Sequence, residues 1–145
     1  MRFNGFSDSE TEKAVTKFWE YFVETGMFEN TVYPDIPETL QKLKYSGKIL
    51  VIATSKVTAY ANRILEHFNL AQYSDFVSGD ERDGSLTKDG KRDVIRIALD
   101  NIDPERKTSA VMIGDRKHDI LGANDVGIDS IGVMWSCYGL FLFMN

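Results

Sequence analysis

Hydroxyl and amine side chains follow an apolar run near the middle of the chain. Thr54, Ser55 and Lys56 come directly after Ile52 and Ala53. If a strand ends here and a helix begins, backbone N–H groups and hydroxyls can hold a phosphate at the helix amino terminus. The alternative is that Thr54 or Ser55 only caps the helix, a common role for these residue types. The spacing predicts one of these two roles.

Two carboxylates four residues apart follow a second apolar run. Asp115 and Asp119 come after Val111–Ile113, with Gly114 between. Magnesium is bound through one or two carboxylates and keeps several waters, so the pair suits Mg2+. The alternative places Asp119 at a helix start and Asp115 in the turn before it. His118 is interpreted as a solvated loop residue.

A lysine opens a predicted helix after the polar loop 84–90. Lys91 stands where a positive charge opposes the helix dipole, so its position indicates an anionic partner. The alternative is a solvated surface lysine, and Lys88 is a competing candidate.

The elements that position these residues alternate between strands and helices. Strands are predicted at Lys48–Thr54, Phe76–Val77, Ala110–Ile113 and Ser130–Met134. Helices are predicted at Ser7–Gly26, from Pro34–Pro37 to Ser46, and at Val57–Phe68, Lys91–Asn101 and Asp119–Val126. This alternation favours an α/β fold with a doubly wound parallel sheet, whose active crevice lies beyond the carboxyl ends of the strands. The candidate residues should therefore meet at one edge of the sheet.

The amino-terminal part differs from the rest of the chain. Ser7 with Glu10, and Ser9 with Glu12, both match the capping box that starts a helix. We expect a helical segment over residues 1–32 and an α/β core over 33–145, with the boundary near Tyr33.

Composition excludes several classes of protein. The chain has 145 residues, 43% hydrophobic and 27% charged, which is typical of a folded globular protein. A net charge of -5 without a basic stripe argues against a nucleic-acid partner. Cys137 is the one cysteine, so we expect a cytoplasmic location, and no apolar run approaches the roughly 20 residues of a membrane span.

Three segments together resemble motifs of the haloacid dehalogenase (HAD) superfamily. They are residues 51–56, 91–95 and 112–123, which are similar to motifs II, III and IV. Residues 32–38 and 127–133 look like the flanking segments of phosphoglycolate phosphatase-like members. The resemblance covers about Ser7 to Tyr138 and implies a HAD-like, Rossmann-like doubly wound sheet.

The resemblance also implies roles for the candidate residues. Thr54 would hydrogen-bond a phosphoryl group, with Ser55 as a second contact, and Lys91 would neutralise charge there as a catalytic residue. Asp115 would hold Mg2+, supported by Asp119. The substrate would be a small phosphorylated metabolite, and the helix Ser7–Gly26 looks like a remnant of the family's helical cap.

One part of the family pattern is absent. Members act through an aspartate nucleophile in an Asp-x-Asp-Gly-Thr motif at the end of the first strand, and neither that strand nor the motif occurs here. The nearest string, residues 81–86, has Glu81 in the nucleophile's place.

We therefore expect a Mg-dependent phosphate monoester hydrolase, phosphoglycolate phosphatase-like, that is impaired as this chain. The alternative is a non-catalytic protein that binds phosphate and Mg2+ or interacts through the fold. A dinucleotide-binding enzyme is a distant third, because no Gly-x-Gly-x-x-Gly follows a strand.

The missing strand predicts a gap in the sheet. In the family's strand order it lies between the strand ending at Thr54 and the strand ending at Asp115. The gap could close by pairing Ile49–Ala53 with Ala110–Ile113, or accept a strand, with Leu140–Phe143 as a donor. We expect self-association through the exposed edges, and we expect Trp19 and Phe22 to be incompletely buried.

Overall fold

The computed structural model describes residues 5–81, 86, 88, 90–102 and 109–134. It divides into two compact units, Met1–Pro34 and Asp35–Asn145. Cys137, the segment Leu140–Phe143 and most of residues 81–86 lie outside the described residues. No described helix is both long and apolar enough to cross a bilayer.

The first unit consists of one long helix and a short turn. Helix α1 spans Asp8–Glu24, and the single-turn helix η1 spans Gly26–Phe28. The Ser7 box is confirmed: Glu10 N–H donates to Ser7 Oγ at 3.3 Å, and Ser7 N–H donates to Glu10 Oε2 at 2.8 Å. The Ser7 hydroxyl, which donates to Glu10 Oε2 at 2.6 Å, lowers the pKa of the Glu10 carboxyl, and the Ser7 N–H adds to this effect. The Ser9 box is not the one that starts the helix.

The aromatic side chains of α1 cluster on its surface. Phe18, Trp19 and Phe22 have ring centroids 5.4 to 5.6 Å apart. Phe18 is 55% exposed and Trp19 is 43% exposed, while Phe22 is half-buried. Incomplete burial of Trp19 and Phe22 agrees with the expectation from the sequence.

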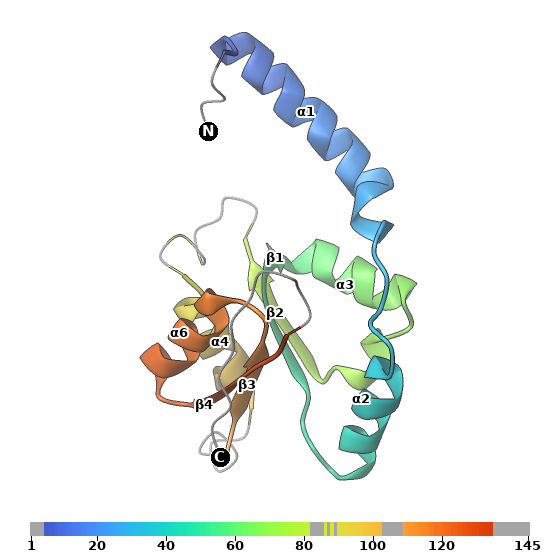
Figure 1. Cartoon of the computed structure of the whole chain (residues 1–145), viewed down its shortest axis with the longest axis vertical. Helices are drawn as coiled ribbons and strands as arrows, with labels where there is room; N and C mark the ends of the chain where they lie inside the picture. Colours follow the sequence, from blue (N-terminus) through green and yellow to red (C-terminus); the bar gives the residue numbers. More distant parts are fainter. Residues whose placement is uncertain (1–4, 82–85, 87, 89, 103–108, 135–145) are drawn as a thin grey trace. The chain divides into compact units, whose positions relative to one another are not determined.

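The second unit has the α/β alternation that the sequence predicts (Figure 1). Its elements are α2 (Ile36–Tyr45), β1 (Val51–Val57), α3 (Thr58–His67), η2 (Ala71–Tyr73), β2 (Phe76–Asp80), α4 (Arg92–Asp100), β3 (Val111–Gly114), α6 (Lys117–Val126) and β4 (Asp129–Gly132). The α/β fold class is confirmed. Helix α6 begins two residues before the predicted Asp119, and β4 ends before Met134.

Strand β1 runs past its predicted end at Thr54. It pairs in parallel with β2, and the register shifts between Ala53, which faces Ser78, and Val57, which faces Asp80. Gly79 permits this extension, because a Cβ there would lie 2.5 Å from the Lys56 carbonyl oxygen. The close approach of the two backbones keeps the chain extended to Val57.

The strands form two parallel pairs. β1 pairs with β2, and β3 pairs with β4. Within the residues that the structure describes, neither β1 nor β2 pairs with β3 or β4. The interruption agrees with the gap that the sequence predicts, and it falls where the sequence places the missing strand. The gap has not closed by direct pairing of β1 with β3.

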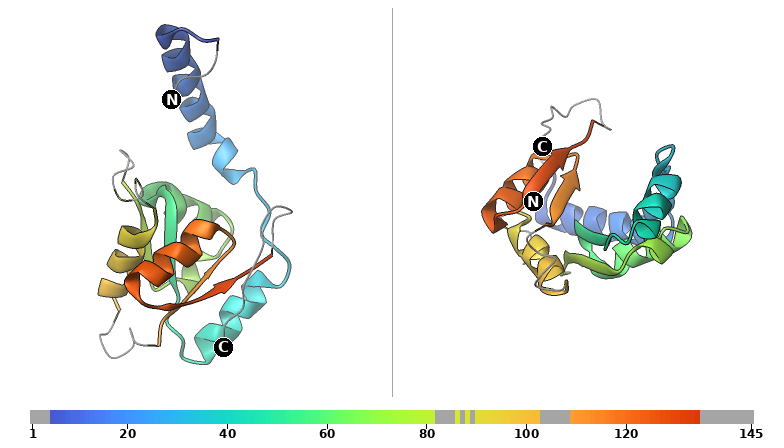
Figure 2. Two further views of the ribbon diagram at one scale, coloured as in Figure 1. Left: turned by 60° about the vertical axis from the view of Figure 1, so that its left-hand side comes forward. Right: turned by 90° about the horizontal axis from the view of Figure 1, so that it is seen from below.

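Helices connect the two strand pairs. α3 and α4 both contact β1 and β2, and they lie on opposite sides of this pair in Figure 1. α6 packs on β3 and β4 and also contacts α4, so α4 and α6 form one layer along both pairs (Figure 2). The buried apolar side chains of this layer are Val94, Ile95, Ala98 and Ala123. On β3, Val111 and Ile113 remain 47% and 53% exposed.

An ion pair fixes α2 beside the start of β2. Lys44 Nζ donates to both Asp75 carboxylate oxygens, at 2.6 and 2.8 Å, and Leu50 N–H donates to Oδ2 at 2.8 Å. The Lys44 hydrogen bond is the main cause that lowers the pKa of Asp75, and the Leu50 N–H adds to it.

Candidate phosphate and metal site

Lys91 links the middle of β1 to the start of α6. It is the residue before α4, and its own carbonyl accepts from Ile95 N–H at 3.0 Å. Its Nζ donates to the Ala53 carbonyl at 3.1 Å and forms an ion pair with Asp119 Oδ1. The Lys91 side chain is only 15% exposed, so the interpretation as a solvated surface lysine is wrong. The competing candidate, Lys88, is exposed.

Asp119 is buried, at 3% exposure, in the first turn of α6. Its Oδ1 accepts from Lys91, and its Oδ2 accepts from Arg116 N–H at 3.0 Å. The capping role considered from the sequence is therefore confirmed, and the same carboxylate also holds Lys91.

Gly114 is a site residue that sequence reasoning missed. A Cβ at this position would lie 2.5 Å from Asp119 Cγ, so only glycine leaves room for the buried carboxylate. Its place between an apolar strand and Asp115 was the signal that could have identified it.

Thr54 lies in the extended part of β1 and does not cap α3. It is half-buried, and its Oγ1 accepts from Lys56 N–H at 3.2 Å. Helix α3 begins only at Thr58, after Val57, and no side chain caps it. The capping alternative for Thr54 and Ser55 is therefore wrong. Ser55 is exposed.

Asp115 is exposed at the bend that follows β3. In the described part of the chain, no three His, Cys, Asp or Glu side chains are grouped around a common metal position. The residues nonetheless fit Mg2+, which needs only one or two carboxylates and takes its other ligands from water and phosphate oxygens. Asp115 would be the direct ligand. Asp119 would act beside it, since each carboxylate oxygen retains a lone pair after its hydrogen bond.

Asp80 is a second residue that sequence reasoning missed. It is 4% exposed at the carboxyl end of β2, where its Oδ1 accepts from Glu81 N–H at 2.7 Å and Leu86 N–H at 3.0 Å. Its carboxylate thus holds the backbone at both Glu81 and Leu86. Asp80 follows the predicted strand Phe76–Val77, so the rule that polar residues after strands form the site could have found it.

The structure brings together Lys91, Asp119 and the part of β1 at Ala53, next to Thr54. The Lys91 ammonium is thus held between a backbone carbonyl and a carboxylate. Asp115, Ser55 and Lys56 are exposed.

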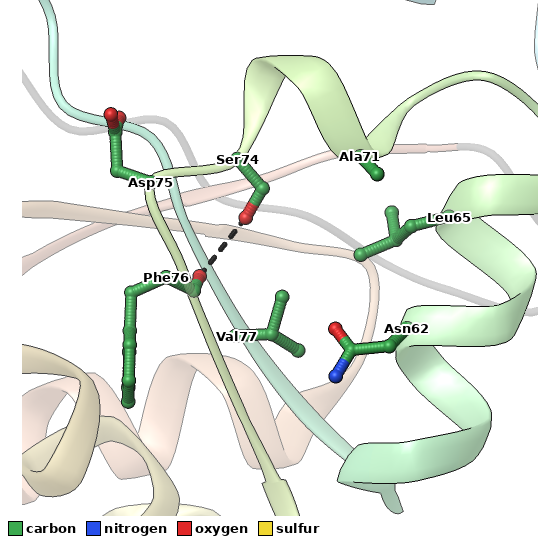
Figure 3. A pocket seen from close by; sticks show the side chains of 7 residues that line it. All are labelled: Asn62, Leu65, Ala71, Ser74, Asp75, Phe76 and Val77. Atoms are coloured by element: carbon green, nitrogen blue, oxygen red, sulfur yellow. Dashed lines mark hydrogen bonds between the residues drawn. The ribbon is translucent and has the colours of Figure 1, made fainter.

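A pocket of about 320 Å³ lies elsewhere, at the amino end of β2 (Figure 3). Its lining is mostly small or apolar and comprises Asn62, Leu65, Ala71, Ser74, Asp75, Phe76 and Val77. The Ser74 hydroxyl donates to the Phe76 carbonyl at 3.0 Å, and none of the candidate phosphate or metal residues lines the pocket.

Comparison with known proteins identifies the class. Residues 2–133 match the family of haloacid dehalogenase-like hydrolases, and the chain belongs to that family. A 5'-nucleotidase of Pseudomonas aeruginosa is 38% identical over 133 residues, which are 92% of this chain and 59% of the relative. The tyrosine-protein kinase PtkA of Mycobacterium tuberculosis is 35% identical over the whole chain and 48% of its own length.

A solved structure agrees with this assignment. A putative phosphatase from Clostridium difficile matches with a TM-score of 0.80 and 42% identity, over 93% of this chain and 60% of that one. The α/β arrangement with parallel strands is thus that of HAD-superfamily phosphatases. The chain spans about half to three fifths of the length of these relatives.

Proposed function

We propose that this chain carries the phosphate-binding and Mg2+-binding half of a HAD-type phosphatase that acts on small phosphate monoesters. The carrying observation is the position of Lys91, whose ammonium contacts Ala53 within β1, next to Thr54, and Asp119, against which Gly114 of β3 is packed. A lysine fixed at this edge supplies a positive charge where a phosphoryl group would meet the strand ends.

Each residue has a separate role in the proposal. Lys91 neutralises phosphoryl oxygens, and the Thr54 hydroxyl donates a hydrogen bond to one of them, with Ser55 as a second donor. Asp115 holds the metal, and Asp119 keeps Lys91 in place beside it. HAD phosphatases generally use Mg2+, which when bound would neutralise charge on the transferred group.

The proposed activity is limited by what this sequence lacks. Phosphoryl transfer by a covalent route needs a nucleophile, and no Asp-x-Asp-Gly-Thr motif occurs in the 145 residues. We therefore expect this chain to hydrolyse substrates weakly at most. The alternative is a protein that binds phosphate and Mg2+ without turnover.

The substrate proposal rests on two segments of the sequence. Residues 32–38 and 127–133 resemble phosphoglycolate phosphatase-like members, which favours a small phosphorylated acid. The names of two relatives refer to other phosphorylated groups: a nucleotide for the 5'-nucleotidase and a protein tyrosine for the kinase. What these settings share is a phosphate monoester.

Hydrolysis of an aryl phosphate with Mg2+ separates the two forms of the proposal. Turnover that Asp115→Ala abolishes supports the enzyme. The control is Asp129→Ala, an exposed carboxylate at the start of β4, which should leave turnover unchanged. If the unaltered chain binds phosphate but does not hydrolyse the aryl phosphate, the non-catalytic alternative is supported. If it shows neither phosphate binding nor hydrolysis, the proposed function is contradicted.

A further inference from the structure

Gly122 lies inside helix α6, a position where glycine is normally unfavourable. Glycine loses more backbone freedom on folding than alanine does, so a helix interior favours alanine. Gly122 is also buried, and none of the roles proposed above involves it. The reason for a glycine here must therefore lie in the groups that pack against it.

The amino end of α4 packs directly on Gly122. A Cβ at this position would lie 2.9 Å from Ile95 Cδ1, 3.2 Å from Lys91 Cβ and 3.3 Å from Arg92 N. The Ile95 atom is the end of a flexible side chain and can turn aside. The other two atoms belong to the start of α4 and cannot move without moving the backbone. The missing side chain of Gly122 thus lets Lys91 come close to α6.

This contact and the ion pair of Lys91 lie on the same face of α6. Gly122 follows Asp119 by three residues, and residues at this spacing are neighbours on a helix surface. The Lys91 side chain therefore starts beside Gly122 and ends at Asp119, where its ammonium forms the ion pair. Gly114 leaves room for the carboxylate of this pair, and Gly122 leaves room for the base of the lysine.

Helix α4 cannot easily shift away as a whole. Its side chains Val94, Ile95 and Ala98 are 0%, 2% and 5% exposed, and the helix contacts β1 and β2 as well as α6. Close-packed interiors resist added volume, which forces local displacements instead. A methyl group on residue 122 should therefore displace Lys91 by a few tenths of an ångström.

We infer that Gly122 is a positioning residue for Lys91 and thereby controls how tightly the site binds phosphate. This inference rests on the proposed function, in which the Lys91 ammonium meets the phosphoryl group. Gly122 itself would touch neither phosphate nor metal, and it would act only through the place that it leaves for the lysine.

Titration of inorganic phosphate into the full chain, with Mg2+ present, tests the inference. Gly122→Ala should weaken phosphate binding by about fivefold or more, because a small misplacement of a positioned group weakens its interactions. The matched control is Asn124→Ala, which adds the same helix-favouring residue at an exposed position of α6 and should leave the affinity unchanged. Equal affinity of the two variants would overturn the inference.

A second variant separates Lys91 from the packing of Ile95. Ile95→Val removes the atom closest to the added methyl group, so in the Gly122→Ala background it should restore part of the stability but not the phosphate affinity. Full recovery of the affinity would show that Ile95 packing was the cause and would overturn the inference. If Gly122→Ala does not fold, as judged by circular dichroism, the double variant replaces it and is compared with Ile95→Val alone.

Urea denaturation distinguishes failure of this inference from failure of the proposed function. If Gly122→Ala already displaces Lys91, Asp119→Asn should lower the urea midpoint less in that background than in the unaltered chain. Equal shifts of the midpoint would overturn the inference even where phosphate binds. Absence of phosphate binding by the unaltered chain would overturn the proposed function and the link to affinity, while the urea comparison would still show whether Gly122 positions Lys91.

Discussion

At the scale of single residues, the ion pair between Lys91 and Asp119 joins the two halves of the candidate site. Both side chains are largely removed from water, at 15% and 4% exposure. Removing one partner of a buried pair leaves the other charge without compensation, which costs far more than the pair contributes when intact. The pair should therefore be important both for stability and for the position of the ammonium.

Asp119→Asn tests the energetic part of this argument. We expect it to lower the free energy of unfolding by about 3 kcal/mol, because the Lys91 ammonium stays buried without its carboxylate. Urea denaturation at neutral pH measures the change. The control, Asp129→Asn, removes an exposed carboxylate and should cost less than about 0.5 kcal/mol. A loss as small as that for Asp119→Asn would mean that the pair is not buried in solution.

Magnesium binding gives a second prediction at this scale. Because Asp115 would be the one direct carboxylate ligand, we expect a dissociation constant in the millimolar range, or roughly -4 kcal/mol. Titration calorimetry of the full chain with MgCl2 measures it. Micromolar affinity would show that further ligands exist beyond Asp115 and Asp119.

The sequence predicted the identity of the central lysine but not what it contacts. Lys91 was singled out because it starts a helix, whereas its bond to Ala53 and its pairing with Asp119 depend on tertiary packing across many residues. For the same reason, Asp119 was predicted as a metal residue and its role in holding Lys91 was missed. Spacing along the chain shows which residues can share an edge, and does not show which of them pair.

At the scale of elements, the link between α2 and β2 is sensitive to pH. Contact with Lys44 and the Leu50 N–H lowers the pKa of Asp75 below its ordinary value in an unfolded chain. A carboxyl group with a lowered pKa in the folded state contributes stability above its unfolded value of about 3.9. That contribution is lost as the pH falls through the lower folded value.

Lys44→Met should reduce this contribution. Because both side chains are about one third exposed, we expect a cost below about 1 kcal/mol at neutral pH, vanishing in strong acid. The pKa of Asp75, measured by carboxyl NMR titration, should rise toward its ordinary value. Lys42→Met, on the same helix and exposed, is the control and should move neither quantity. An unchanged Asp75 pKa in Lys44→Met would contradict the assigned cause.

Element types were predictable from the sequence, and several element ends were not. The alternation of apolar runs and amphipathic segments identified the described strands and the α-helices that surround them. The predicted end of β1 was wrong because the strand is extended by contacts with β2. Gly79 of β2 lies close to the Lys56 carbonyl, and Asp80 of β2 pairs with Val57. Local residue preferences carry no information about such contacts.

At the scale of the whole molecule, the sheet is interrupted and apolar side chains remain exposed. Val111 and Ile113 lie on β3, and Phe18 lies on α1. Exposed apolar surface and open strand edges both favour association. The sequence predicted the site of the interruption because the resemblance located the missing strand. It left open whether the gap would close.

Self-association should therefore depend on β3. Size-exclusion chromatography with light scattering should show oligomers or aggregates for the unaltered chain. Ile113→Lys should lower the mean mass, whereas Tyr45→Lys, on α2, should not. A monodisperse, cooperatively melting monomer at high concentration would contradict this expectation.

The central claim, that Lys91 holds a phosphoryl group at the strand ends, is tested most directly by titrating inorganic phosphate into the full chain with Mg2+ present. Chemical-shift changes at Thr54 and Gly114 report the binding. We expect saturable binding that Lys91→Met weakens at least tenfold, because the ammonium is lost, and that Lys88→Met, an exposed lysine nearby in sequence, leaves unchanged. The account would be contradicted if phosphate bound equally well to the unaltered chain and to Lys91→Met. It would also be contradicted if the chemical shifts of Thr54 and Gly114 did not change on phosphate binding.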